Sequence, residues 1–348
     1  MSASASPFRR IALGLLVLIT VVAGISIWWS GSQQDPEAAF QQTLLDFKND
    51  YESAGLSKRH VFAEYYDALT PVPMLVLLDR SFPQCHNEGH ELGMVVYERV
   101  GELVEAINLC DHHCTGGCMH GVVLEAFSQN SFEELTADLD AFCKRGAMAN
   151  RYKPGNCAHS LGHALMMASG RDLAQSLNGC NLFELDAMRY YCATGAYMEY
   201  FNTIFRPDPA GGFHGPCNEF DLYPAACYRY KTSEMAYLMD NNWDAAAAEC
   251  DTLSHFHRLG CYHGLGHGVR QAVMDEAYTV GDICERGRHE DAQMCIEGLI
   301  EKWQDWNPAA ALAACNSVSE SLKPTCTAAA NDGMYRLDKP TIGLYLGN

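Results

Sequence analysis

The spacing of the cysteines constrains this chain more than any other feature of its sequence. Of the 16 cysteines, 14 fall into two interleaved series, with steps of 31 to 39 residues within a series and gaps of 8 to 14, most often 11, between them. A period in the mid-thirties is typical of stacked helix-turn-helix units. We therefore predict an all-α fold of about seven such units. The first series is Cys110, Cys143, Cys180, Cys217, Cys250, Cys284 and Cys315, and the second is Cys118, Cys157, Cys192, Cys227, Cys261, Cys295 and Cys326.

The pairing of the cysteines follows from these two series. In each unit the first Cys ends a first helix, as Cys250 does, and the second Cys opens a second helix, as Cys261 does. An even number of cysteines in an exported chain indicates disulfides, and thiolate zinc sites need clusters of four ligands that evenly spaced pairs do not supply. We predict the pairs 143–157, 180–192, 217–227, 250–261, 284–295 and 315–326. For the remaining four cysteines the simplest assignment is 85–114 with 110–118, although spacing alone permits other connectivities.

The period and the hairpin pattern resemble those of the tetratricopeptide and Sel1-like repeat families. That resemblance implies an α/α superhelix, either open or curled into a closed form, over residues 85–348. Residues 37–84 lack the cysteine pattern and are predicted to form an N-terminal helical cap, with helix breaks at Gly55 and at Pro71-Val-Pro73.

The N-terminal segment predicts the location of the protein. Arg9 and Arg10 precede an uncharged, mainly apolar run over 11–29, which is long enough to cross a bilayer. Because basic residues stay on the cytoplasmic side, we expect residues 1–30 to be a signal anchor with a cytoplasmic N-terminus and 31–36 to be a linker. The rest of the chain would then be periplasmic or extracellular. A cleaved signal peptide is the alternative.

Charge and missing motifs exclude several function classes. The formal net charge of −19 argues against nucleic acid partners and against binding to anionic membrane surfaces, so the only membrane contact expected is the N-terminal helix. The chain has no nucleotide-binding loop, no nucleophile elbow and no zinc-peptidase signature. The sequence therefore predicts no catalytic residue.

One histidine motif occurs three times at the start of predicted second helices. His-x-x-Gly-His follows Cys85, Cys157 and Cys261, and it accounts for six of the 14 histidines. Positions i and i+4 share one face of a helix, so the two imidazoles can chelate one metal ion. The pairs are His86 with His90, His159 with His163, and His263 with His267.

The cysteine register adds further candidate ligands. Glu297 and Glu301 occupy the register positions of a histidine pair, and His120 lies two residues after Cys118. The predicted metal ligands are therefore His86, His90, His120, His159, His163, His263, His267, Glu297 and Glu301. Imidazoles suit Cu, Fe or Zn, and carboxylates favour Fe or Zn among these.

Two functions fit these features. The first is a membrane-anchored, extracytoplasmic metal-binding protein, of an oxidase or metal-handling type, which requires the units to curl until separate histidine pairs meet. The second is a scaffold or assembly factor without metal, whose concave face binds a partner protein. The motif glycine costs roughly 1 kcal/mol in a helix, so we expect it to permit the close approach of either a ligand or a neighbouring helix.

Overall fold

The computed structural model describes residues 36–55, 58–82, 85–137, 139–144, 153–204, 212–304 and 307–339. Over these residues the protein is all-helical, with 76% helix and no strand. The predicted signal anchor (1–30) and nearly all of the predicted linker (31–36) lie outside the described residues. Among the described residues, no helix combines the length and the apolar character needed to cross a membrane.

Three helices precede the first cysteine, and the chain breaks between them where predicted. They are α2 (Pro36–Ser53), α3 (Arg59–Leu69) and α4 (Pro71–Ser81). Pro71 begins α4, where a missing N–H costs nothing, and Thr70 before it has a φ of 58° that turns the chain. Buried Phe47 and Phe62 hold α2 against α3, with ring centroids 6.0 Å apart.

The rest of the described chain consists of helical hairpins. The longer helices are α5 (His86–Val100), α7 (Gly117–Ala126), α10 (Pro154–Ala168), α12 (Asp186–Thr203), α13 (Pro224–Leu238), α15 (His255–Met274), α17 (His289–Gln304) and α19 (Lys323–Asp332). The shorter ones are α6 (Leu103–Asn108), η1 (His113–Gly116), α8 (Phe132–Thr136), α9 (Leu139–Lys144), α11 (Leu173–Cys180), η3 (Cys217–Glu219), α14 (Trp243–Asp251), α16 (Val280–Cys284), α18 (Pro308–Ala314) and η4 (Cys315–Ser317). Each longer helix from α7 onward follows one or more short ones, as the cysteine register predicts.

Eight disulfides join all 16 cysteines in the predicted pairs. Cys85 pairs with Cys114 and Cys110 with Cys118, which confirms the simplest assignment for the N-terminal four. The other bridges span 10 to 14 residues each and tie the short helix of a hairpin to the start of its long helix.

Glycines bring successive long helices into backbone contact. A Cβ on Gly162 of α10 would lie 2.0 Å from the carbonyl oxygen of Cys192, and a Cβ on Gly195 of α12 would lie 1.9 Å from that of His159. The same reciprocal contact joins α15 to α17 through Gly266 and Gly298. The motif glycine therefore serves the close approach of a neighbouring helix, one of the two roles expected from the sequence.

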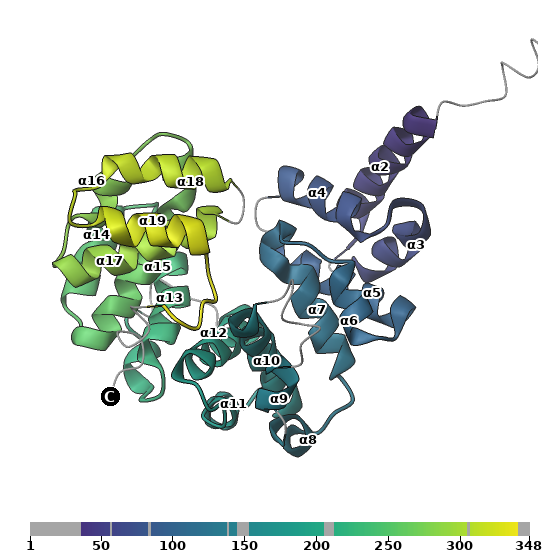
Figure 1. Ribbon diagram of the computed structural model, residues 1–348, viewed down its shortest axis with the longest axis horizontal. Helices are drawn as coiled ribbons and strands as arrows, with labels where there is room; N and C mark the ends of the chain where they lie inside the picture. Colours follow the sequence, from purple (N-terminus) through teal and green to yellow (C-terminus); the bar gives the residue numbers. More distant parts are fainter. Residues whose placement is uncertain are drawn as a thin grey trace, which may run out of the picture.

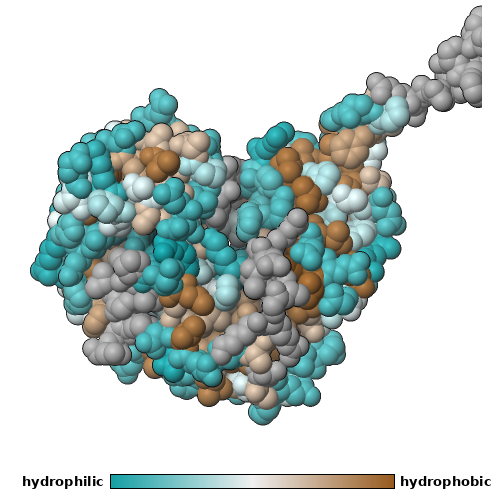
Figure 2. Space-filling model, viewed as in Figure 1, coloured by the Kyte–Doolittle hydropathy of each residue, from teal (hydrophilic) through white to brown (hydrophobic). Residues whose placement is uncertain are grey.

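The hairpins follow one another around an arc (Figure 1). The helices from α2 to α7 form one arm, α8 to α12 form the base, and α13 to α19 form the other arm. The long helices pack in sequence, α10 on α12, α13 on α15 and α15 on α17. Hydrophilic residues predominate over the outer helices on the face drawn in Figure 2.

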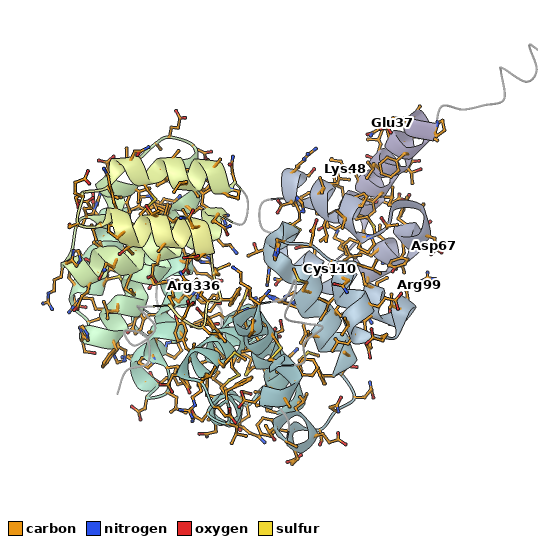
Figure 3. All side chains as sticks on the ribbon, in the orientation of Figure 1. Glu37, Lys48, Asp67, Arg99, Cys110 and Arg336 are labelled. Carbon is orange, nitrogen blue, oxygen red and sulfur yellow. A yellow bond between two sulfur atoms is a disulfide. The ribbon has the colours of Figure 1, made fainter. Side chains whose placement is uncertain are left out.

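After α19 the chain turns back across the middle of the molecule. The Lys153 ammonium, just before α10, donates to the carbonyl oxygens of Asp332 and Met334 at 2.8 and 3.0 Å. The Tyr191 hydroxyl of α12 donates to the carbonyl oxygen of Arg336 at 2.8 Å, and Figure 3 labels Arg336 on this segment. The segment 333–339 thus links the last hairpin to the base of the arc.

Candidate metal centre

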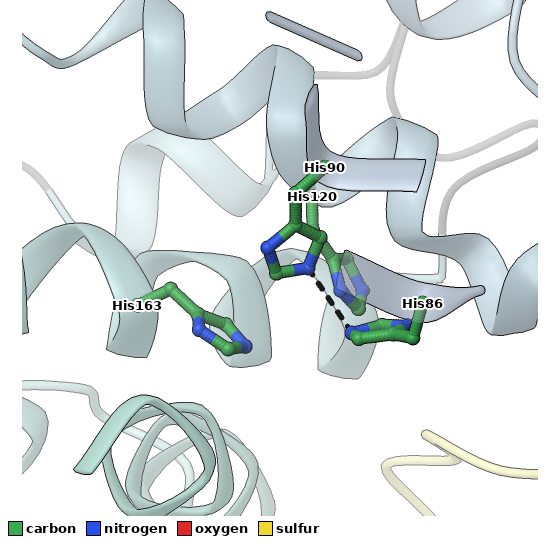
Figure 4. Close-up of side chains that lie close together, drawn as sticks. All are labelled: His86, His90, His120 and His163. Atoms are coloured by element: carbon green, nitrogen blue, oxygen red, sulfur yellow. Dashed lines mark hydrogen bonds between the residues drawn. The ribbon is translucent and has the colours of Figure 1, made fainter. Parts of the chain in front are cut away.

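Four histidines from three helices meet at one point. His86 and His90 lie on α5, His120 on α7 and His163 on α10, and one ring nitrogen from each lies within 4.8 Å of the others (Figure 4). His120 and His163 are fully buried, and His90 is 8% exposed. Residues 77 positions apart in the sequence therefore face one buried volume.

The spacing within the histidine pairs suits a shared metal ion. The Nε2 atoms of His86 and His90 are 3.0 Å apart, and those of His159 and His163 are 3.3 Å apart. Two nitrogens bound to one tetrahedral metal at 2.0–2.1 Å would be separated by roughly 3.4 Å. Each i, i+4 pair already has about that separation.

Partners on the outer nitrogens decide which nitrogen carries the inward lone pair. The carbonyl oxygen of Cys114 accepts from Nδ1 of His86 at 3.1 Å, and the Glu199 carboxylate accepts from Nδ1 of His163 at 3.0 Å. Because neither partner can donate, both Nδ1 atoms carry a proton, and in the neutral ring of His86 the lone pair lies on Nε2. The same tautomer holds metal-binding histidines in place generally.

His159 is fixed in the same way by a hydroxyl. Its Nδ1 lies 2.8 Å from Oγ1 of Thr194, and that hydroxyl donates its proton to the carbonyl oxygen of Tyr191 at 2.6 Å. The hydroxyl must therefore accept from His159, which leaves the lone pair on Nε2. Nε2 of His163 lies 3.3 Å from this atom, within hydrogen-bonding distance.

His120 differs from His86 and His159, because its lone pair lies on Nδ1 and not on Nε2. Its Nε2 donates to Oδ1 of Asn156 at 2.8 Å, so the lone pair lies on Nδ1. That Nδ1 atom is buried and has no hydrogen-bond partner. An unsatisfied buried acceptor costs about 1–3 kcal/mol, and a metal ion at this position would satisfy it.

Burial keeps four of the clustered imidazoles neutral, those of His86, His90, His120 and His159. Burial, followed by the neighbouring histidines, lowers the pKa of His86, His90 and His159 well below the usual value. Burial and His163 lower the pKa of His120 to about 3. Neutral imidazole is the form that binds metals. Although burial opposes ionisation of Glu199, its hydrogen bond with His163 lowers the pKa of that carboxyl.

The remaining four predicted ligands lie on α15 and α17, where His263, Glu297 and Glu301 form a second cluster. Here Nε2 of His263 lies 4.0 Å from Oε2 of Glu301. Glu297 and Glu301 both pair with the Lys339 ammonium, at 2.9 Å for Glu297. The structure thus brings together five of the nine predicted ligands at the histidine centre. Of the other four, Glu297 and Glu301 pair with Lys339, His263 lies beside Glu301, and His267 lies on α15.

The two clusters lie near each other inside the arc. Lys302, near the end of α17, is close enough to His86, His120 and His267 to contribute to the lowered pKa of each, after burial. The ring of Tyr335, in the C-terminal segment, contacts that of His159 in a tilted arrangement, with ring centroids 5.3 Å apart. The arc is therefore curled enough for both arms to border one interior.

Sequence reasoning missed the outer partners of the histidines. Asn156, Thr194 and Glu199 each hold a histidine 35 or 36 residues away, one repeat period along the chain. The repeat period was the sequence signal from which these partners could have been predicted. Asp79 also lies near Cys85 and Cys114, but those sulfurs form a disulfide and offer no thiolate.

Comparisons with protein-family models, with curated proteins and with solved structures found no match for this chain. The functional argument therefore rests on the geometry of the site.

Proposed function

We propose that the protein binds a transition-metal ion through His86, His90, His120 and His163, with His159 adjoining. The observation that carries this proposal is the orientation of the lone pairs. The buried Nδ1 of His120 carries a lone pair without a hydrogen-bond partner, and the lone pairs of neutral His86 and His159 lie on Nε2. A metal ion in this volume would satisfy the orphaned nitrogen.

The donor set favours copper or zinc. All four grouped ligands are imidazoles, and imidazole suits both metals, with copper(II) the tighter binder in the usual order of affinities. The carboxylates that would have favoured iron, Glu297 and Glu301, pair with Lys339 instead. We therefore prefer copper or zinc to iron.

The number of protein ligands favours metal handling over oxidation chemistry. Sites that hold a metal for structure use four protein ligands, whereas catalytic sites keep a position open for water or substrate. Four converging histidines complete such a coordination sphere. We propose that the protein stores, transfers or is stabilised by its metal.

We also propose that the disulfide-linked hairpins lie in an oxidising compartment. Eight disulfides suit an oxidising compartment, and the N-terminal apolar run would anchor the hairpins there as a tetratricopeptide-like or Sel1-like superhelix. The alternative is a scaffold whose concave face binds a partner. On that face such a partner would have to displace the chain's own segment 333–339, whose Arg336 carbonyl is bound by Tyr191.

Metal analysis of the purified full-length protein in detergent tests the proposal. After dialysis against Cu(II) or Zn(II), we expect a stoichiometric metal content that is lost in His86→Ala/His90→Ala. The matched control is His263→Ala/His267→Ala, which removes the same motif from the other cluster and should keep the metal.

A wild-type protein that is folded and takes up no copper, zinc or iron would refute the proposal. Equal loss of metal in both double variants would also refute it, because the centre would then not be at α5, α7 and α10.

A further inference from the structure

The helix pair α15–α17 repeats the layout of the histidine centre with carboxylates in place of some imidazoles. His263 and His267 lie one turn apart on α15, and Glu297 and Glu301 lie one turn apart on α17. His263, Glu297 and Glu301 are 1%, 4% and 2% exposed. The backbone contacts of Gly266 with Cys295 and of Gly298 with His263 hold the two helices as close together as α10 and α12.

A cation already occupies the space between the two carboxylates. The Lys339 ammonium lies 2.9 Å from Oε2 of Glu297 and also pairs with Glu301. Lys339 is 8% exposed, so this ion pair is shielded from water. The lysine comes from the segment after α19, outside the repeats that supply the carboxylates.

The same position suits a metal ion. Carboxylate oxygens bind divalent metals at roughly 2.0–2.2 Å, so the two glutamates need to close by less than about 1 Å around a smaller cation. His263, whose Nε2 is 4.0 Å from Glu301, would be the third ligand. Two carboxylates with one or two imidazoles suit Zn(II), Mn(II) or Fe(II).

We propose that Glu297, Glu301 and His263 form a second site for a divalent transition metal, and that Lys339 blocks it as a displaceable occupant. This inference goes beyond the histidine centre and does not depend on it. The C-terminal segment would open or close the second site, because withdrawing one side chain leaves two buried carboxylates that require a cation.

The arrangement allows Lys339 to leave. The segment 333–339 is not helical, and its residues 335–338, directly before Lys339, are partly or fully exposed. Segments of this kind open at a lower free energy than core helices do. Metal and lysine therefore compete for one pair of carboxylates.

Counting Zn(II) by equilibrium dialysis tests the inference on the full-length protein. We expect Lys339→Met to bind one more equivalent than the wild type, and Lys339→Met/Glu297→Gln/Glu301→Gln to return to the wild-type number. Lys323→Met, which removes a lysine of α19 paired with exposed Glu320, should match the wild type.

The outcomes separate the two proposals. A wild type without zinc together with a Lys339→Met variant holding one equivalent supports the second site, and it refutes the histidine centre if the wild type takes up no copper or iron either. A folded Lys339→Met variant with the wild-type number overturns the second site. If Lys339→Met does not fold in the absence of metal, cooperative melting restored by Zn(II) supports the site, and failure of Zn(II) to restore it overturns the site.

Discussion

At the scale of single residues, the partner on the outer nitrogen of each histidine determines the chemistry. Cys114, Thr194 and Glu199 accept hydrogen bonds from the Nδ1 atoms of His86, His159 and His163. In the neutral rings of His86 and His159 this leaves the lone pair on Nε2. The His-x-x-Gly-His spacing predicted which imidazoles share a helix face. It could not predict the tautomers, because these depend on residues from other repeats.

Removing the carboxylate behind His163 should weaken metal binding. Loss of an outer partner typically lowers metal affinity 10- to 100-fold, so we expect Glu199→Ala to raise the dissociation constant of Cu(II) or Zn(II) by about that factor in a chelator-competition titration. Glu125→Ala is the matched control, since Glu125 has the same position seven residues after its cysteine but binds Arg59 at 2.9 Å. Equal effects of the two changes would contradict a role for Glu199 at the centre.

Acid should destabilise the metal-free protein. Burial lowers the pKa of six histidines, so below pH ~6.5 the unfolded chain binds protons that the folded chain does not. They are His86, His90, His120, His159, His263 and His267. Stability then rises with pH, and one such histidine contributes about 1.4 kcal/mol per pH unit below that value.

One group opposes this trend. Burial raises the pKa of Glu301 to about 7, so the folded state takes up a proton there as the pH falls from about 7, which offsets roughly one histidine. The net result is a lower urea midpoint at pH 5.5 than at pH 7.5 in the presence of a chelator. An unchanged midpoint would show that the histidines are not held neutral.

At the scale of helices, the glycines determine how closely ligand-bearing pairs approach. The sequence predicted the helices and left two roles open for the motif glycine. The structure resolves this, because a Cβ at Gly162 or Gly195 would lie within 2.0 Å of a backbone oxygen of the neighbouring helix. Sequence alone could not decide the question, because the partner glycine stands in the next repeat, without a local signature.

Adding one methyl group at such a contact should be destabilising. In Gly195→Ala the new Cβ would meet the backbone oxygen of His159 at 1.9 Å, and backbone cannot move aside as a flexible side chain can. Overpacking of this kind costs about 1–3 kcal/mol, more than the gain of roughly 1 kcal/mol in helix propensity. We expect a lower urea midpoint and, because His159 shifts, weaker metal binding.

A glycine without neighbours provides the comparison. A Cβ at Gly55 meets nothing within 4 Å, so Gly55→Ala should leave the free energy of unfolding within about 0.5 kcal/mol of the wild type. If Gly195→Ala were as harmless as this control, the helices would not be in the backbone contact described.

At the scale of the whole molecule, the cysteine period predicted the hairpins and their staples but not the curvature. Curvature accumulates from small rotations between successive units, which depend on side-chain packing at each contact rather than on the period. The position of Lys339 beside Glu297 and Glu301 could not be predicted either, because nothing in the sequence distinguishes this lysine among the 24 basic residues. The convergence of His86 with His163 is therefore a property of the folded arc alone.

Because each disulfide lies within one hairpin, we expect the loss of a disulfide to affect mainly the hairpin that contained it. Each bridge closes a short loop, 14 residues for Cys143–Cys157 and 10 for Cys217–Cys227, so both should contribute about 3 kcal/mol. Replacing either pair by serine should lower stability by a similar amount.

Only the first change should weaken metal binding, because Cys157 lies two residues before His159 in α10, whereas α13 after Cys227 supplies no histidine to the centre. Thermal melting with metal titration measures both quantities, and equal loss of metal affinity in the two variants would mean that the arc responds as one body instead of unit by unit.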